Sequence, residues 1–224
     1  MKYKGIVFDF NGTLFWDTKL HNEAWDIFLE KYQIRLNDDE KFRTFHGKTN
    51  KDIFITLFGN ILSDQQIIDY IIEKETLYQK LCLEYLVSTD NPLAPGVVPF
   101  LDLLEEREIP FTIATASDKI NVDFYFEHLG LSQWFDYSKV VYNDGTIRGK
   151  PNPDLYQKAL SIIGLLPAEV IVFEDAINGL MAARNAEAGK IIIVDSNNDD
   201  YSGWENFRII TDYNQLDYSE LLYL

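Results

Sequence analysis

The feature that most constrains the fold is a regular alternation of short apolar runs with segments of helical periodicity, which begins after Gly96. The pattern predicts strands at 111–114, 139–142, 170–173 and 191–194, helices at 97–106, 119–129, 154–163 and 177–185, and a last helix over 213–224. Strands that alternate with helices of this length indicate a parallel sheet covered by helices on both faces.

A further apolar run lies near the amino terminus. Ile6-Val7-Phe8 precedes Asp9 and a turn at Asn11-Gly12, which predicts a buried parallel strand with a loop at its carboxyl end. From about residue 17 to 88, apolar residues recur at helical spacing. Because a lone strand is not stable, the first strand must join the later sheet, and the helical segment is then an insertion over the ligand-binding edge of that sheet. The expected domains are an α/β core of residues 1–15 and 92–224 and a helical cap of residues 16–91.

Composition argues against several classes of function. The 224 residues carry a formal net charge of −16, which repels nucleic acid backbones and anionic membranes. The apolar run at the amino terminus is too short for a signal peptide or a membrane span. The single cysteine, Cys82, excludes an intramolecular disulfide and fits a reducing compartment. We therefore expect a cytoplasmic protein, a monomer or weak dimer, that binds neither nucleic acid nor membranes.

Polar side chains are expected at the carboxyl ends of four strands. They are Asp9, Thr115 followed by Ala116 and Ser117, Lys150 before a helix, and Glu174 with Asp175. Taken singly, such residues are as common in turns, on solvated surfaces and at helix N-termini. Because the carboxyl ends of parallel strands meet at one edge of the sheet, together they predict one site.

Each residue type suits one part of phosphoryl transfer. A carboxylate at Asp9 can attack phosphorus and form an acyl phosphate once the repulsion between the anions is suppressed. Mg²⁺ would suppress that repulsion, and Asp9 and Asp175 are natural ligands for it. Lys150 would balance the phosphoryl oxygens and keep Asp9 ionised. Thr115 and the two N–H groups after it, which we expect to open a helix, would cradle the phosphate.

On these residues, the chain resembles the haloacid dehalogenase superfamily along nearly its whole length. The first motif of that family, Asp-x-Asp-Gly-Thr, appears as Asp9-Phe10-Asn11-Gly12-Thr13, and the third as Lys150-Pro151-Asn152-Pro153-Asp154. Thr115 matches the second motif, and Glu174-Asp175 matches the fourth. The resemblance implies a Rossmann-like, doubly wound α/β core with an inserted α-helical cap, an aspartyl phosphate on Asp9, and Mg²⁺ held by Asp9, Asn11, Glu174 and Asp175.

Within the family, the predicted helical cap is most similar to the beta-phosphoglucomutase-like and sugar-phosphatase branch. The similarity lies in His21 with Ala24-Trp25, and in the loop His46-Gly47-Lys48-Thr49. It implies a small phosphorylated substrate, and a sugar phosphate is the leading candidate. The candidate substrate-binding residues are His21, Gly47, Lys48, Thr49, Lys80, Ala116 and Ser117. A phosphatase and a mutase with a second phosphate site in the cap both stay open.

The chain departs from the family at Asn11. In the family, the second Asp of the first motif binds the metal through its carbonyl and shuttles a proton through its side chain. Asn11 keeps the carbonyl, but its carboxamide has no proton to exchange near neutral pH. General acid–base catalysis contributes ~10²–10⁴-fold, so turnover of an ordinary sugar phosphate should fall by that order. On this reasoning, Asn11→Asp would raise that turnover about tenfold or more.

Three accounts of Asn11 are open. The substrate could have a leaving group that departs without a proton, or a residue such as His21, or a water, could supply the proton. Alternatively, the chain could be a catalytically weakened protein that only binds phosphorylated metabolites. The pattern favours an active phosphatase or phosphotransferase, slowed by the loss of the acid.

Overall fold

The computed structural model describes residues 3–45 and 48–218. In this part of the chain, the strands are β1 (Gly5–Phe8), β2 (Phe111–Asp118), β3 (Val141–Asn143), β4 (Val170–Glu174), β5 (Lys190–Val194) and β6 (Arg208–Ile210). They form one parallel sheet in the order β3-β2-β1-β4-β5-β6. The amino-terminal strand therefore lies inside the sheet that the later strands build, as the sequence indicates.

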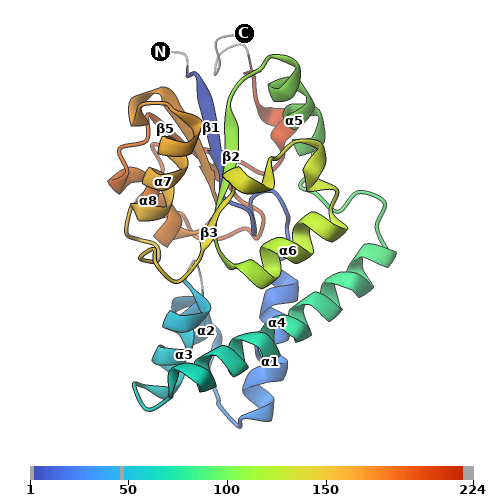
Figure 1. The fold of residues 1–224 in the computed structure, drawn as a ribbon, viewed down its shortest axis with the longest axis vertical. Helices are drawn as coiled ribbons and strands as arrows, with labels where there is room; N and C mark the ends of the chain where they lie inside the picture. Colours follow the sequence, from blue (N-terminus) through green and yellow to red (C-terminus); the bar gives the residue numbers. More distant parts are fainter. Residues whose placement is uncertain (1–2, 46–47, 219–224) are drawn as a thin grey trace.

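Helices cover both faces of this sheet (Figure 1). They are α5 (Val97–Glu106), α6 (Lys119–His128), α7 (Asp154–Ile163) and α8 (Ile177–Asn185). Side chains of successive strand residues point to opposite faces, so Phe8 packs in the cluster with Phe100 of α5, whereas Val7 packs in the cluster with Leu155 of α7. Every residue of β1 and β4 is buried, as expected of strands covered on both faces. The predicted doubly wound α/β fold is confirmed.

A second group of helices, called here the helical insert, lies beyond the carboxyl edge of the sheet (Figure 1). It consists of α1 (Thr18–Lys31), α2 (Asp38–Phe45), α3 (Asn50–Phe58) and α4 (Asp64–Val87). Its own aromatic cluster is centred on Trp25, Phe28 and Phe54. A capping box between Ser63 and Gln66 starts α4. The expected domain boundaries fall in the two connections between the insert and the sheet, and the division itself stays a prediction.

Three elements differ from the expectation. Strand β2 continues to Asp118, because Asp118 pairs with Asn143 of β3. These two residues are distant in the sequence, so a local pattern does not predict the pairing. The short edge strand β6 was not predicted, since only one of its three residues is buried. The expected last helix starts as a 3₁₀ turn, Tyr213–Gln215, which is followed by two non-helical residues, and residues 219–224 lie outside the described part.

Among the described residues, none of the helices has the length and apolar character needed to cross a membrane. Cys82 is a buried residue of the main core cluster.

Candidate active site

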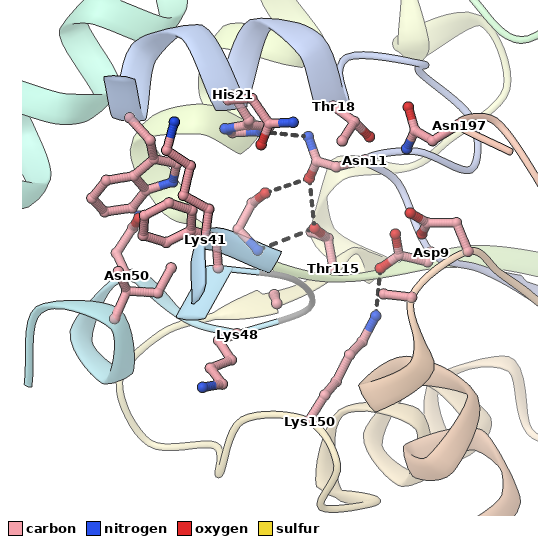
Figure 2. A pocket seen from close by; sticks show the side chains of 18 of the residues that line it. Asp9, Asn11, Thr18, His21, Lys41, Lys48, Asn50, Thr115, Lys150 and Asn197 are labelled. Atoms are coloured by element: carbon pink, nitrogen blue, oxygen red, sulfur yellow. Dashed lines mark hydrogen bonds and ion pairs between the residues drawn. The ribbon is translucent and has the colours of Figure 1, made fainter. Parts of the chain in front are cut away.

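A cavity of about 530 Å³ lies between the carboxyl edge of the sheet and the helical insert. Its walls include Asp9, Thr115 and Lys150 from the sheet side, and His21 and Lys48 from the insert (Figure 2). Lys74 of the insert also lines the cavity. The structure thus brings together residues of the first, second and third motifs, as expected when parallel strands end at one edge.

Asp9 follows directly after β1, at the bottom of the cavity. The Nζ atom of Lys150 lies 2.6 Å from Asp9 Oδ1 (Figure 2). The same atom lies 2.7 Å from Glu174 Oε2. The Tyr156 hydroxyl and the backbone N–H of Ala176 also donate to Glu174. Glu174 is therefore occupied in holding Lys150 in place, and Lys150 points at the carboxylate of Asp9.

The charges of this group do not balance. Burial and the Glu174 carboxylate raise the pKa of Asp9 to about 7, although Lys150 acts in the opposite direction. Burial and the carboxylates of Glu174 and Asp9 also raise the pKa of Asp175 well above its usual value. Three buried carboxylates thus share one ammonium, and a divalent cation would offset the excess negative charge.

The carboxylates of Asp9, Glu174 and Asp175, called here the acidic cluster, have the geometry and chemistry of a cation site. One oxygen of each lies within 4.8 Å of the others. Oxygen donors of this kind suit a hard divalent cation. Gly12, at φ +77°, permits the close approach, since a Cβ there would lie 2.1 Å from Asp175 Oδ2. The glycine of the first motif is needed to bring its loop against Asp175.

Thr115 and Ser117 lie on the cavity wall within β2. The backbone N–H of Ser117 donates to Thr115 Oγ1 over 3.1 Å. The expectation that the N–H groups of Ala116 and Ser117 open a helix is wrong, because α6 begins at Lys119. All three residues line the cavity, so extended backbone faces the place where a phosphate would lie.

The Asn11 side chain lies between His21 and Thr115, and both of its polar atoms have protein partners (Figure 2). Its Nδ2 donates to Asp17 Oδ2 over 2.6 Å and to the Tyr125 hydroxyl over 2.8 Å. Its Oδ1 accepts from Ser117 Oγ over 2.7 Å. Each polar atom of this carboxamide therefore has a protein partner.

His21 and Lys74 of the helical insert lie next to Asn11 and Asp17. His21 Nε2 lies 3.4 Å from Asp17 Oδ2, and its Nδ1 lies 2.8 Å from Lys74 Nζ. The His21 ring stacks on Tyr78, with the ring centroids 3.8 Å apart. Lys74 also donates to the buried Glu75. The lysine of the insert that lines the cavity is thus Lys74, where the sequence analysis expected Lys80.

The placement of Lys80 at the substrate is wrong. Its side chain is 75% exposed and lies 4.0 Å from Glu84. Lys74, Tyr78 and Cys82 repeat at helical spacing and are buried, so Lys80 lies on the opposite face of α4.

The two described residues of the loop before α3 have different roles. Lys48 lines the cavity, whereas Thr49 caps α3 by accepting from the N–H of Asp52. Gly47 lies outside the described residues. Asn50 donates to Glu75 over 2.7 Å and to Asp118 over 2.8 Å, which ties the insert to the end of β2.

Residues 3–187 match the family model of the haloacid dehalogenase-like hydrolases. The chain is a haloacid dehalogenase-like hydrolase. The resemblance found in the motifs is therefore confirmed over most of the chain, including the helical insert.

Several proteins of known name are similar to this chain. Protein CbbY of Rhodobacter capsulatus is 30% identical over 192 residues, or 83% of each chain. The fructose-1-phosphate phosphatase YqaB of Escherichia coli is 27% identical over 187 residues, which cover 83% of this chain and 93% of the relative. The validoxylamine A 7'-phosphate phosphatase of Streptomyces hygroscopicus is 27% identical over 190 residues, or 82% of each chain.

Solved structures share the whole fold of this hydrolase. A family IA, variant 3 hydrolase from Entamoeba histolytica has a TM-score of 0.82 at 35% identity. The match covers 98% of this chain and 97% of the Entamoeba chain. A beta-phosphoglucomutase from Clostridium difficile has a TM-score of 0.78 at 21% identity, with 97% and 95% coverage, and shows the common fold alone.

Sequence reasoning missed several residues of the hydrolase site. Asp17 follows the apolar residues Leu14-Phe15-Trp16, and this break in an apolar run was the available signal. Lys74 and Glu75 sit in a helix among apolar residues, and only the helix phase relative to the cavity identifies them. Asn197, after β5, also lines the cavity.

Proposed function

We propose that the chain is a Mg²⁺-dependent phosphatase that hydrolyses a small phosphorylated metabolite through an aspartyl phosphate on Asp9. A sugar phosphate is the leading candidate for the substrate. The observation that carries the proposal is the position of the Asp9 carboxylate, 2.6 Å from the Lys150 ammonium and within the acidic cluster, at the bottom of a cavity. Two of the similar proteins, a fructose-1-phosphate phosphatase and a validoxylamine A 7'-phosphate phosphatase, act on small phosphorylated compounds, and this supports the choice.

Asp9 is placed to act as the nucleophile. Its free carboxylate oxygen attacks phosphorus, the bond from phosphorus to the leaving oxygen breaks, and water then hydrolyses the aspartyl phosphate. Mg²⁺, held by Asp9, Asp175 and the Asn11 carbonyl, with Glu174 close by, would neutralise negative charge between nucleophile and phosphate. Lys150 holds Asp9 in position, and its charge offsets the phosphoryl oxygens.

The second-motif residues are placed to bind the phosphoryl group. Thr115 Oγ1 and the polar atoms of Ser117 lie on the same wall of the cavity as the carboxyl end of β1. Hydrogen bonds from this wall would fix the phosphate for attack, and positioning of this kind supplies much of the rate of phosphoryl transfer.

We further propose that residues 16–91 act as a cap over a core of residues 1–15 and 92–224. The insert closes the cavity from the side opposite Asp9, and it contributes His21, Lys48 and Lys74 to the walls. A cap in this place excludes water and carries the groups that select the substrate. The acidic composition and the single cysteine support a cytoplasmic enzyme that is a monomer or weak dimer.

A beta-phosphoglucomutase-type mutase is the second candidate. Lys48 places a cation on the insert wall, away from Lys150, and a second phosphate on the same substrate could bind there (Figure 2). A mutase would convert a sugar 1-phosphate into the 6-phosphate in the presence of a bisphosphate primer, without net phosphate release.

The proposal is tested by screening phosphorylated metabolites for phosphate release with and without Mg²⁺. Asp9→Asn is the control variant, and mass measurement after incubation with an acyl phosphate checks Asp9 for a phosphoryl group. We expect Mg²⁺-dependent release by the parent alone. Binding of substrates without release, and with Asp9 unmodified, would instead identify a phosphometabolite-binding protein.

A further inference from the structure

Glu75 is a buried acid that the proposed reaction does not use. Its side chain is 1% exposed, and it lines the cavity from α4. Among the described residues, three donors reach its carboxylate: Asn50 Nδ2 over 2.7 Å, Lys74 Nζ over 3.0 Å and Asn121 Nδ2 over 2.7 Å. Burial raises the pKa of Glu75, but Lys74, His21 and the two amides outweigh it and hold the pKa below its usual value. Glu75 is therefore a fixed negative charge in the cavity wall.

Lys74 and Glu75 form an ion pair on that wall. Both side chains line the cavity, and the adjacent carboxylate offsets much of the attraction that the ammonium would have for a phosphate. The contacts among the described residues use only part of the donor hydrogens of Lys74 and of the acceptor sites of Glu75. The pair thus offers a donor and an acceptor side by side. A hydroxyl group, which both donates and accepts, matches such a pair.

The rest of the insert wall is apolar or paired. Lys41 lies 2.6 Å from Asp26, and both line the cavity. Trp25, Phe45 and Ile53 add apolar surface, and the rings of Trp25 and Phe45 stack with their centroids 4.7 Å apart. Apolar surface with a few fixed polar groups suits the uncharged body of a small metabolite.

The two ends of the cavity therefore differ in charge. Lys150 and the acidic cluster, with the cation that it would hold, lie at the sheet edge, around Asp9. Asn50, which donates to Glu75, lies on the insert side and well apart from Asp9 (Figure 2). A substrate with its phosphate at Asp9 places the rest of its body against the insert wall. A second phosphate there would meet the charge of Glu75, and like charges in a buried site repel strongly.

We propose that the Lys74–Glu75 pair binds a hydroxyl group of the substrate and that Glu75 excludes a second phosphate, so that the enzyme hydrolyses sugar or polyol monophosphates and is not a mutase. This inference rests on the proposed function and names the substrate class of the same site. Glu75 acts on binding alone, and the bonds that form and break at phosphorus are those of the proposed reaction.

The test compares three phosphates that share a six-membered ring and a primary leaving oxygen. Glucose 6-phosphate carries hydroxyl groups, cyclohexylmethyl phosphate carries none, and glucose 1,6-bisphosphate adds a second phosphate. The assay is kcat/KM for phosphate release at saturating Mg²⁺, with fructose 1-phosphate and fructose 1,6-bisphosphate as a further pair. We expect the parent to prefer each monophosphate to its bisphosphate, and glucose 6-phosphate to cyclohexylmethyl phosphate, by about tenfold or more.

Glu75→Gln removes the charge and keeps the size of the side chain. We expect its monophosphate-to-bisphosphate ratio of kcat/KM to fall about tenfold or more, and its KM for glucose 6-phosphate to rise more than its kcat falls. Asp38→Asn is the matched control, because it removes one negative charge from an exposed position on the same cavity wall, where solvent screens it. The control should keep both ratios of the parent. Circular dichroism checks the folding of each variant, and if Glu75→Gln does not fold, the ratios of the parent decide the question.

Four results would overturn the inference and leave an Asp9-dependent enzyme in place. They are a parent that turns over bisphosphates as well as monophosphates, a parent that accepts cyclohexylmethyl phosphate as well as glucose 6-phosphate, an unchanged monophosphate-to-bisphosphate ratio in folded Glu75→Gln, and phosphorylation of Asp9 by acetyl phosphate without release from any sugar phosphate. Conversion of glucose 1-phosphate into glucose 6-phosphate, with glucose 1,6-bisphosphate as primer, would also overturn it and identify the mutase. Absence of phosphate release from every substrate, with Asp9 unmodified by mass, would instead refute the proposed function and the inference with it.

Discussion

Removal of the Asp9 charge should stabilise the metal-free protein at neutral and alkaline pH. In the folded state, burial and Glu174 raise the pKa of Asp9 from 3.8 to about 7. The folded protein therefore holds a proton on Asp9 that the unfolded chain releases, so stability falls as pH rises from 3.8 toward 7. A shift of about three units corresponds to roughly 4 kcal/mol, and Asp9→Asn removes this penalty.

The measurement is urea denaturation of the parent and Asp9→Asn at several pH values in the presence of a chelator. We expect Asp9→Asn to be more stable than the parent by up to about 4 kcal/mol at pH 8, and the difference to disappear near pH 4. Added Mg²⁺ should reverse the order, because it binds the folded parent more tightly than the variant. A metal-free variant that is less stable than the parent at pH 8 would refute the reasoning.

Three further predictions test the site and its surroundings. Lys150→Met leaves Asp9 and Glu174 buried without their cation and should cost about 3–5 kcal/mol in urea denaturation, in addition to activity. Lys74→Met should raise KM for the substrate or abolish turnover, whereas its matched control on the same helix, Lys80→Met, should leave kcat and KM unchanged. Gly179→Ala places a Cβ 2.0 Å from the Glu174 carboxyl carbon and should lower stability by about 1–3 kcal/mol, read from the urea midpoint.

Much of the fold could be predicted because its signals are local. The helices at 97–106, 154–163 and 177–185 have the bounds expected from apolar periodicity. The strands β1 and β4 are continuous apolar runs because both faces are covered. By contrast, the end of β2 depends on a pairing between Asp118 and Asn143, and no local pattern announces a pairing with a distant strand.

The same distinction applies to the site. Asp9, Thr115 and Asp175 could be found in the sequence because each ends, or directly follows, a predicted strand at one edge of the sheet, and Lys150 because it lies in the short loop before a predicted helix. Lys80 was misplaced because the side of α4 that faces the cavity depends on how the insert packs on the core.

The sequence by itself determined the alternation of strands and helices, and the motif residues that this alternation carries to one edge. Only the tertiary structure decided how Asn11 is used. Its partners Asp17, Ser117 and Tyr125 come from a loop, a strand and a helix that are distant in the chain. Whether a buried carboxylate is stabilised, and which atom donates to it, is a property of that assembled environment. For that reason, the sequence shows only that an acid is missing at position 11, whereas the folded protein shows that the Asn11 amide donates a hydrogen bond to Asp17.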